Sequence, residues 1–412
     1  MNFLITGAQF KNKGAQSLLF TSINEIKTHY PDAVIYYVPI DGNSEGCFNK
    51  VYQYKFIFVY DDLAYKDAPA KAGVISYIRR KIIINIRANK ILKVTNRKAM
   101  LLSDVWEKID VMIDVSGYIL SSKFNIKANN RYIRYINSAA SLGIPIFLMP
   151  QSFGPFDYDL NKNQMLKSIS SSLKKANIIY AREMEGKELL EKKCGISGVK
   201  INPDIVLQNK NIDLDNIFSN IPEMIYPSIN TDNNVGIIPN NQTIKFGDES
   251  SILNRYISII KLLLSKGKNV YIFRHSDDLH LCRNIYIAID DKTHCFLIED
   301  DLDCIVYSKF VSQFEFIIAS RYHAIVHAYK ENVPSVILGW SIKYYELAKY
   351  LKQEQYVFDI TKDSASSKLI NAVNDMMENL ERNKISISCE LRKIQSEKCF
   401  TECWKTLDEI QG

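Results

Sequence analysis

The chain has 412 residues, of which 47% are hydrophobic and 24% charged, an ordinary globular composition with room for two or three domains. Its formal net charge of +6 is too small for a dedicated nucleic-acid-binding protein and suits small acidic substrates or an anionic surface. The eight cysteines are scattered without a CxxC motif or framework spacing, which favours a reducing compartment. No signal-peptide pattern and no run of about 20 apolar residues occurs, so we expect a cytoplasmic protein that is neither exported nor membrane-spanning.

The first half of the chain predicts an α/β domain with a parallel sheet. Apolar runs typical of strands alternate with helical patterns, and these runs cover residues 2–6, 34–39, 56–60, 110–115, 145–149 and 178–180. In such sheets ligands bind beyond the carboxyl ends of the strands. The residues at or just after these strand ends, and therefore candidate ligand contacts, are Asp114, Gln151, Ser152 and Arg182.

A glycine-bearing loop connects the first strand to a helix that begins near Ala15. It contains Asn12 and Gly14, and its backbone N–H groups and the positive end of the helix dipole suit a phosphate or carboxylate. Every α/β domain has such a first turn, so this loop is a weak signal by itself.

The second half predicts another parallel-sheet domain. Residues 208–233 are rich in Asn, broken by Pro and without a sustained period, which is typical of a linker. The strands expected after it cover residues 235–238, 269–273, 294–297, 314–319, 335–338 and 356–358, with helices over 252–264 and 369–380. We therefore expect domains at 1–207 and 234–384, facing each other across a cleft in a glycosyltransferase-B-like arrangement, and a helical segment at 385–412 that packs back across the domain junction.

Three potential cations gather at two neighbouring strand ends of the second domain. Arg321 and His323 follow the strand over residues 314–319, and Lys343 follows the next strand. If the backbone stays extended past Ala319, Arg321 and His323 lie on one face, and a single anionic ligand could contact both. His275, which follows the strand over 269–273, also points toward this crevice.

A metal site is the main alternative for the histidine pair. His323 and His327 have the spacing of two ligands on one helix face, but no Glu occupies the position found in zincins and no third ligand is evident. We predict no metal here and interpret His327 as a buried or half-buried helix histidine. The acidic residues before the helix predicted over 302–307 complement its dipole, and they are Glu299, Asp300, Asp301 and Asp303.

Taken in order, these motifs resemble the polysaccharide pyruvyltransferase family. That family shows Asn-x-Gly-Ala-Gln after its first strand, Pro-Gln-Ser-aliphatic-Gly-Pro after a later one, Arg-x-His at a strand end, and a Lys after the next strand. The positions of this chain that match are Asn12, Gly14, Gln151, Ser152, Pro155, Arg182, Asp204, Arg321, His323 and Lys343. The chain departs from the pattern after Asp114, where the family often has successive glycines and this sequence has Gly117 alone.

The resemblance implies transfer of the enolpyruvyl unit of phosphoenolpyruvate to two hydroxyls of a sugar, which gives a cyclic pyruvate ketal and free phosphate without a cofactor. The acceptor implied is a precursor of a bacterial surface polysaccharide, either capsule or exopolysaccharide. Phosphoenolpyruvate carries two anionic groups, which suit Arg182 and Arg321, while His323 suits a general acid and Lys343 the departing phosphate. The remaining candidate substrate-binding residues are Asn12, Gly14, Asp114, Gln151, Ser152 and His275.

Two other functions fit the same pattern. A glycosyltransferase that uses a nucleotide sugar would place a diphosphate between the same two domains. A non-catalytic glycan-binding member of the fold is the second alternative. The partners expected for a pyruvyltransferase are phosphoenolpyruvate and a sugar acceptor. No nucleic acid is expected as a partner for any of these three functions.

Residues 71–98 are rich in Lys and Arg and contain no Asp or Glu. Their apolar residues recur at steps of three to five, which predicts a basic amphipathic helix. A solvated basic face on an ordinary core helix explains the pattern about as well. Because surface glycans are assembled on polyprenyl-diphosphate carriers at the inner face of the membrane, we expect this segment to make peripheral contact with anionic membrane, near a polyprenyl-diphosphate-linked acceptor.

Overall fold

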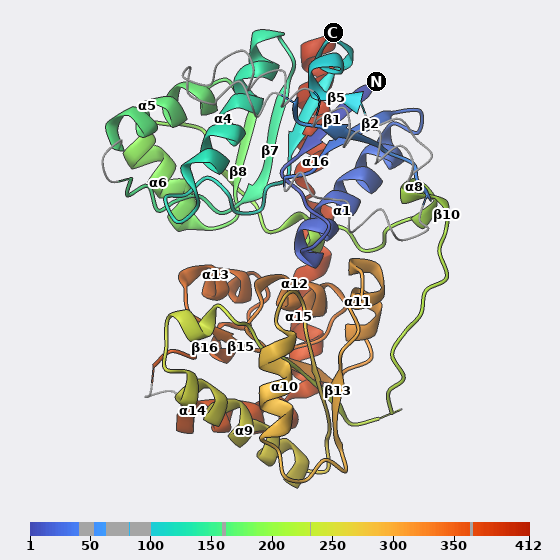
Figure 1. The fold of residues 1–412 in the computed structure, drawn as a ribbon, viewed down its shortest axis with the longest axis vertical. Coiled ribbons are helices and arrows are strands. Elements are labelled where there is room, and N and C mark those ends of the chain that lie inside the picture. The colour runs from blue at the N-terminus through green and yellow to red at the C-terminus, as the bar shows by residue number, and fades with distance from the viewer. Residues whose placement is uncertain (41–52, 63–81, 83–99, 159–161, 231, 363–365) are drawn as a thin grey trace.

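The computed structural model describes residues 1–40, 53–62, 82, 100–158, 162–230, 232–362 and 366–412. Two α/β domains lie one above the other, and the chain crosses between them twice (Figure 1). Apart from residue 82, the basic segment 71–98 lies outside the described residues, so its predicted helix and membrane contact stay predictions. None of the described helices is long and apolar enough to cross a membrane.

The N-terminal domain is built on an eight-stranded parallel sheet of order β5-β4-β2-β1-β6-β7-β8-β9. Its strands are β1 (Asn2–Thr6), β2 (Val34–Val38), β4 (Ile57–Tyr60), β5 (Met100–Leu101), β6 (Val111–Asp114), β7 (Ile146–Gln151), β8 (Ile178–Ala181) and β9 (Lys200–Ile201). The helices are α1 (Lys13–His29), α4 (Ile126–Ser141), α5 (Lys162–Leu173), α6 (Met184–Cys194), α7 (Ile205–Gln208) and α8 (Leu214–Ile217).

The C-terminal domain has a six-stranded parallel sheet of order β13-β12-β11-β14-β15-β16. Its strands are β11 (Asn234–Ile238), β12 (Asn269–Phe273), β13 (Cys295–Ile298), β14 (Phe316–Ala319), β15 (Ser335–Gly339) and β16 (Val357–Asp359). The helices are α9 (Glu249–Ser265), α10 (Leu279–Ile287), α11 (Cys304–Val311), α12 (Tyr322–Lys330), α13 (Ile342–Tyr350), α14 (Ser366–Glu378), α15 (Leu380–Ser396) and α16 (Cys399–Gln411).

All the strands predicted from apolar runs are present, with ends that differ by at most two residues. The strands that the sequence did not reveal are the short ones, namely β3 (Gln53–Tyr54), β5, β9 and β10 (Phe218–Asn220). The segment predicted as a linker, 208–233, contains α8 and β10, and β10 pairs with β3 in the N-terminal domain. The first part of this segment is therefore folded, which its Asn-rich composition concealed.

The helix predicted over about 385–411 is two helices, α15 and α16. The chain leaves the lower domain along α15, which contacts α7, and reaches the upper domain in α16. There Trp404 lies 6.0 Å from Phe3 and 5.4 Å from Tyr30, measured between ring centroids, and the Tyr180 hydroxyl donates to Glu402 at 2.6 Å. The C-terminal helix is thus part of the N-terminal core.

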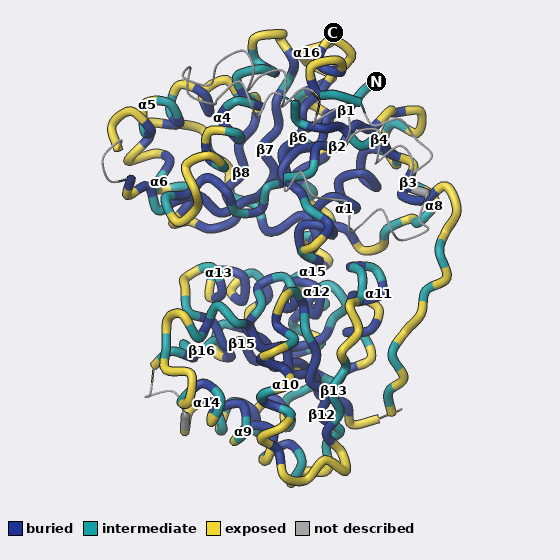
Figure 2. Tube along the Cα trace, in the orientation of Figure 1, coloured by how far each residue is buried: buried dark blue, intermediate teal, exposed yellow. Residues whose placement is uncertain are grey.

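One apolar cluster is continuous across both domains. It joins Phe3 and Ile113 of the first sheet, through Leu18 of α1, to Ile325 of α12 and Ile317 of the second sheet. Figure 2 shows the buried backbone concentrated in the two sheets and in the elements between them. Because burial of apolar surface is the main favourable term in folding, this shared core holds the domains together at one side of their junction.

Candidate functional site between the two sheets

The amino ends of α1 and α12 meet where the two domains face each other. A Cβ added to Gly14 in the first turn of α1 would lie 2.1 Å from Cγ of His323, in the first turn of α12. Only a residue without a side chain permits this approach. Asn12 caps α1, since its Oδ1 accepts from the backbone N–H groups of Gly14 at 2.9 Å and Ala15 at 3.3 Å. The predicted loop therefore opens the helix as expected, and its glycine positions the histidine.

Arg182 lies at the end of β8 in a buried polar cluster. Its Nε donates to Ser152 Oγ at 2.9 Å and to Glu183 Oε1 at 3.0 Å, and its Nη1 donates to Asp204 Oδ2 at 3.1 Å. The guanidinium also lies 4.3 Å from the ring centroid of Tyr322, which belongs to the other domain. Arg182 is thus held between two carboxylates and the ring of Tyr322, and its charge is already compensated within the protein.

His323 faces this cluster from the C-terminal domain. Its Nε2 lies 3.5 Å from Oδ2 of Asp204, the oxygen that Arg182 also contacts. Burial lowers the pKa of His323, although Asp204 opposes that effect, so the imidazole is neutral near pH 7. Burial raises the pKa of Asp204, but His323 and Arg182 outweigh it and the net pKa is lowered. Asp204 therefore links an arginine of one domain to a histidine of the other.

Arg321 is the N-cap residue of α12, and the helix begins at Tyr322. Arg321 itself is still extended, but the chain turns helical at Tyr322, so the condition under which Arg321 and His323 would share one extended face is not met. The guanidinium pairs with both oxygens of Asp278, and the Nε to Oδ2 distance is 2.6 Å. Since Asp278 has no exposed surface, Arg321 neutralises a buried carboxylate while part of its own side chain remains accessible.

Lys343 lies in the first turn of α13 among four aromatic rings. Its Nζ is 5.5 Å from the centroids of Tyr118 and Tyr344, 5.6 Å from Tyr322 and 5.9 Å from Trp340. No carboxylate among the described residues forms an ion pair with it. Burial and then repulsion from Arg182 lower the pKa of Lys343 to about 8, and Glu183 opposes them. This ammonium is the most available cation of the cluster.

His275 and His327 extend the cluster into the C-terminal domain. The His275 ring lies 6.4 Å from His323 and 5.9 Å from His327, and its Nδ1 lies 3.2 Å from Ser276 Oγ. Burial lowers the pKa of both His275 and His327 well below the usual value. His327 is buried, as the sequence predicted, and its Nε2 lies 2.9 Å from Oγ of Ser17 in α1.

Asp114 and Gln151 are buried at neighbouring strand ends and bond to each other, with Gln151 Nε2 donating to Asp114 Oδ1 at 3.3 Å. Asp114 also accepts from the hydroxyls of Thr6 at 2.7 Å and Ser116 at 3.0 Å. Burial raises the pKa of Asp114 against these hydrogen bonds. Both side chains serve to tie strand ends together here, and their contact with a substrate stays a prediction.

Several residues that shape the site are absent from the sequence-based set of contacts. Asp278 and Glu183 pair with the two arginines, and Tyr322 and Trp340 surround Lys343. Asp278 lies a few residues beyond the strand end that carries His275, so the strand-end rule could have indicated it. No pattern in the sequence reveals which carboxylate pairs with which arginine.

Other polar contacts join the domains beside the site. Lys13 Nζ lies 2.7 Å from Asp301 Oδ1, and Gln16 Oε1 accepts from the backbone N–H of Cys304 at 2.9 Å. Asp303 caps α11 by accepting from Ile305 and Val306, so the acidic residues before this helix include its cap. Within the described residues, no group of three or more His, Cys, Asp or Glu side chains has the arrangement of a metal site.

The fold is that of glycosyltransferase-B enzymes. The chain matches the spinosyn rhamnosyltransferase SpnG with a TM-score of 0.53 and 10% identity, covering 99% of this chain and 100% of that one. The UDP-GlcNAc 2-epimerase from Neisseria meningitidis bound to UDP-GlcNAc matches with a TM-score of 0.54, 12% identity and 94% of each chain. The UDP-GlcNAc 2-epimerase from Methanocaldococcus jannaschii matches with a TM-score of 0.54, 12% identity, and 91% and 92% coverage. At these identities the likeness shows the fold alone.

The family assignment comes from the sequence. No curated protein matches this chain. The family model described as polysaccharide pyruvyl transferase matches residues 12–342, a span that begins at the cap of α1 and ends at the residue before Lys343. This span contains Arg182, Arg321 and His323 and covers well over half of the chain. The chain belongs to the polysaccharide pyruvyl transferase family.

Proposed function

We propose that the protein transfers the enolpyruvyl unit of phosphoenolpyruvate to two hydroxyls of one sugar in a surface-polysaccharide precursor. The products are a cyclic pyruvate ketal and phosphate. The observation that carries this proposal is the convergence of cations from both domains at one aromatic ring, since the Arg182 guanidinium lies 4.3 Å and the Lys343 ammonium 5.6 Å from the ring centroid of Tyr322. Of these cations, Lys343 has no carboxylate partner among the described residues, and the nearby Arg321 stays partly accessible. Both favour an anionic ligand, and phosphoenolpyruvate combines a phosphate with a carboxylate.

The residues divide the binding of the two anionic groups. Lys343 is a compact point charge without a carboxylate partner in the described part of the chain, and we assign it to the phosphate. Arg321 is partly accessible and presents a planar guanidinium, which suits the carboxylate. Arg182 is buried and paired with two carboxylates, so we assign it to holding Asp204 and Tyr322 in place beside the reacting atoms.

The chemistry requires a proton at the methylene carbon of phosphoenolpyruvate. Burial favours the neutral imidazole of His323, but an arriving multiply charged anion favours the imidazolium and raises the pKa of His323. The imidazolium then donates to C3, and positive charge develops at C2, where one sugar hydroxyl adds. Phosphate leaves, the second hydroxyl adds to C2, and of the two hydroxyl protons one replaces the proton given to C3 and the other leaves with the phosphate.

The runner-up is a glycosyltransferase that takes a nucleotide sugar, and it rests on the fold shared with SpnG and the UDP-GlcNAc epimerases. Thermal unfolding of the purified protein with each candidate donor separates the two functions. We expect phosphoenolpyruvate to raise the midpoint temperature of unfolding of the wild type but not that of Lys343→Met. UDP-GlcNAc should leave the midpoint temperature of both proteins unchanged. A shift from UDP-GlcNAc alone would favour the glycosyltransferase, and a shift from neither donor would favour a non-catalytic glycan-binding protein.

A further inference from the structure

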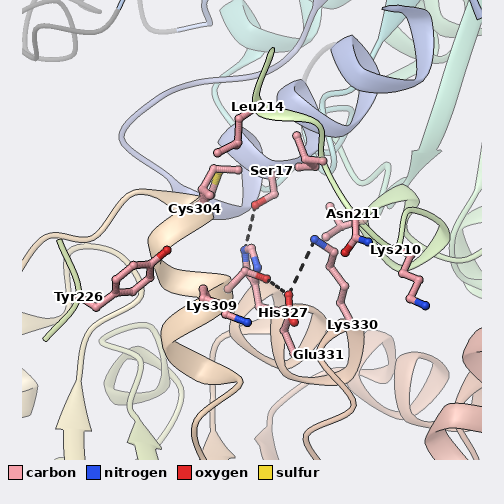
Figure 3. A pocket seen from close by; sticks show the side chains of 14 residues that line it. Ser17, Lys210, Asn211, Leu214, Tyr226, Cys304, Lys309, His327, Lys330 and Glu331 are labelled. Carbon is pink, nitrogen blue, oxygen red and sulfur yellow. Dashed lines mark hydrogen bonds and ion pairs between the residues drawn. The ribbon is translucent and has the colours of Figure 1, made fainter. Parts of the chain in front are cut away.

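A pocket of about 320 Å³ lies beside the candidate active site, on the other side of the contact between α1 and α12. Its walls come from α1, the segment after α7, α11 and the last turn of α12. Figure 3 shows Lys330 and His327 rising from α12 toward Ser17 and Asn211. The volume is in the range of pockets that hold small organic molecules, and the lining residues include none of those assigned above to phosphoenolpyruvate.

The lining carries an excess of positive charge, since Lys210, Lys309 and Lys330 face a single acidic residue, Glu331. Lys330 is the buried member, with 8% of its side chain exposed. Its ammonium is 4.0 Å from Glu331, at the outer limit of an ion pair, and the same carboxylate oxygen accepts from Ser308 at 2.7 Å. A largely desolvated ammonium with so distant a counter-ion favours an additional anion, and burial lowers the pKa of Lys330 accordingly.

His327 ties the pocket wall to α1. Ser17 donates its hydroxyl proton to the carbonyl of Lys13 at 2.8 Å, so it accepts from Nε2–H of His327. His327 is neutral because burial lowers its pKa, and its Nδ1 therefore holds a lone pair. Nδ1 is buried and has no hydrogen-bond partner among the described residues. A buried acceptor without a partner is costly in free energy, and no water-sized atom reaches it from the pocket.

We propose that this pocket binds a phosphate monoester, with the phosphate at Lys330 and Lys309 and the organic part filling the rest of the pocket volume. Lysine suits the compact tetrahedral charge of phosphate, and the described lining contains no arginine fork for a planar carboxylate. A monoester carries a charge of about −1.5 to −2 at pH 7, which matches the excess of lysines. Because the pocket joins α1 to α11 and α12, the occupant braces the two domains against each other.

Calorimetric titration with glucose 6-phosphate tests the site, with inorganic phosphate and glucose as the other two probes. We expect glucose 6-phosphate to bind, inorganic phosphate to bind more weakly, and glucose not to bind. Lys330→Met should lower the affinity for glucose 6-phosphate by about ten-fold or more, because a contact to a charged group is lost. The exposed Lys266 at the end of α9, far from the pocket, gives the matched control Lys266→Met, which should bind like the wild type.

Two further variants show where glucose 6-phosphate binds and give a result that misfolding cannot produce. Lys343→Met removes the main cation of the candidate active site, so binding that persists in it belongs to the pocket. Glu331→Gln removes the opposing negative charge and keeps an oxygen for Ser308, so it should tighten binding. Three results would each overturn the proposal. The first is that the wild type does not bind glucose 6-phosphate, and the second is that Lys343→Met loses this binding. The third is that the wild type, Lys330→Met and Glu331→Gln bind it with equal affinity.

Discussion

At the residue scale, the charge on Lys343 lowers the stability of the fold, a cost that its proposed role in phosphate binding explains. The free energy of unfolding is lowered by holding an ammonium among aromatic rings without a carboxylate partner in the described residues. The pKa of Lys343 is about 8 in the folded chain against an ordinary value of 10.5, so between these pH values the unfolded chain binds more protons. The free energy of unfolding therefore rises with pH from about 8 to 10.5, where the folded protein has already shed the charge.

We predict that Lys343→Met raises the free energy of unfolding at pH 7 by about 1 to 3 kcal/mol, because Lys343 is half-buried and water reduces the full cost. The same change should lower transfer by about 30-fold or more, as expected for a lost contact to the developing phosphate. Urea unfolding at pH 7 and pH 10.5, with kcat/KM at pH 7, provides the check. Equal unfolding of wild type and variant at pH 7 would show that the charge carries no such cost.

Arg321 has a structural partner that the sequence did not reveal. If the arginine contacted only a ligand, its removal would leave the fold intact, but it pairs with both oxygens of a carboxylate that has no exposed surface. We predict that Arg321→Ala lowers the free energy of unfolding by about 3 to 5 kcal/mol, because Asp278 is left as a buried unpaired charge.

A double variant separates the two roles of Arg321. Arg321→Ala with Asp278→Asn should recover most of the unfolding free energy, since no buried charge remains, and should still fail to release phosphate from phosphoenolpyruvate. Chemical denaturation and a phosphate-release assay on the same preparations measure both. Wild-type turnover in the double variant would remove Arg321 from the active site.

At the element scale, the approach of α1 to α12 sets the position of His323. The distance of 2.1 Å between a Cβ built on Gly14 and Cγ of His323 is far below any real contact, so Gly14→Ala must move the imidazole or separate the helices. Overpacking of this kind costs about 1 to 3 kcal/mol.

We predict that the main effect of Gly14→Ala is a loss of kcat, with a smaller effect on the melting temperature, because the substitution displaces the proposed acid from Asp204. Gly186→Ala is a suitable control, since Gly186 is also helical and its added Cβ meets no atom closer than 3.2 Å. A Gly14→Ala enzyme with wild-type kcat would mean that His323 tolerates displacement and is not the acid.

The strands and the loop at Gly14 were predictable because each depends on a local pattern of apolar residues and glycine. The pairing of Asp204 with His323 was not predictable, because it depends on how two domains face each other across more than one hundred residues of sequence. The pairing of Arg182 with Asp204, 22 residues apart within one domain, follows no local pattern either. Likewise the break between α15 and α16 follows from contacts with the N-terminal core rather than from a Pro or Gly signal.

At the scale of the whole molecule, the C-terminal helix ties the end of the chain to the N-terminal domain. Trp404 of α16 packs against Phe3 of β1 and Tyr30 at the end of α1, and 6% of it is exposed. We predict that Trp404→Ala lowers the free energy of unfolding by about 3 to 5 kcal/mol, as for other buried tryptophans. Ile410→Ala on the same helix should change it little, because Ile410 is 48% exposed.

The same Trp404→Ala protein should keep its activity below its melting temperature, since α16 contributes none of the residues assigned to phosphoenolpyruvate. Chemical denaturation and an assay at low temperature test this pair of expectations. A variant as stable as the wild type would show that α16 is not part of the N-terminal core in solution.

We propose that the cations gathered between the two domains serve ketal formation from phosphoenolpyruvate. The most direct test is mass spectrometry of the purified protein incubated with phosphoenolpyruvate and a panel of hexosides, alongside His323→Ala and a phosphate assay. We predict an acceptor that gains the mass of one pyruvate less one water, one phosphate released for each product molecule, and no product from His323→Ala. Sugar transfer from UDP-GlcNAc to the same hexosides, with no product from phosphoenolpyruvate, would contradict it.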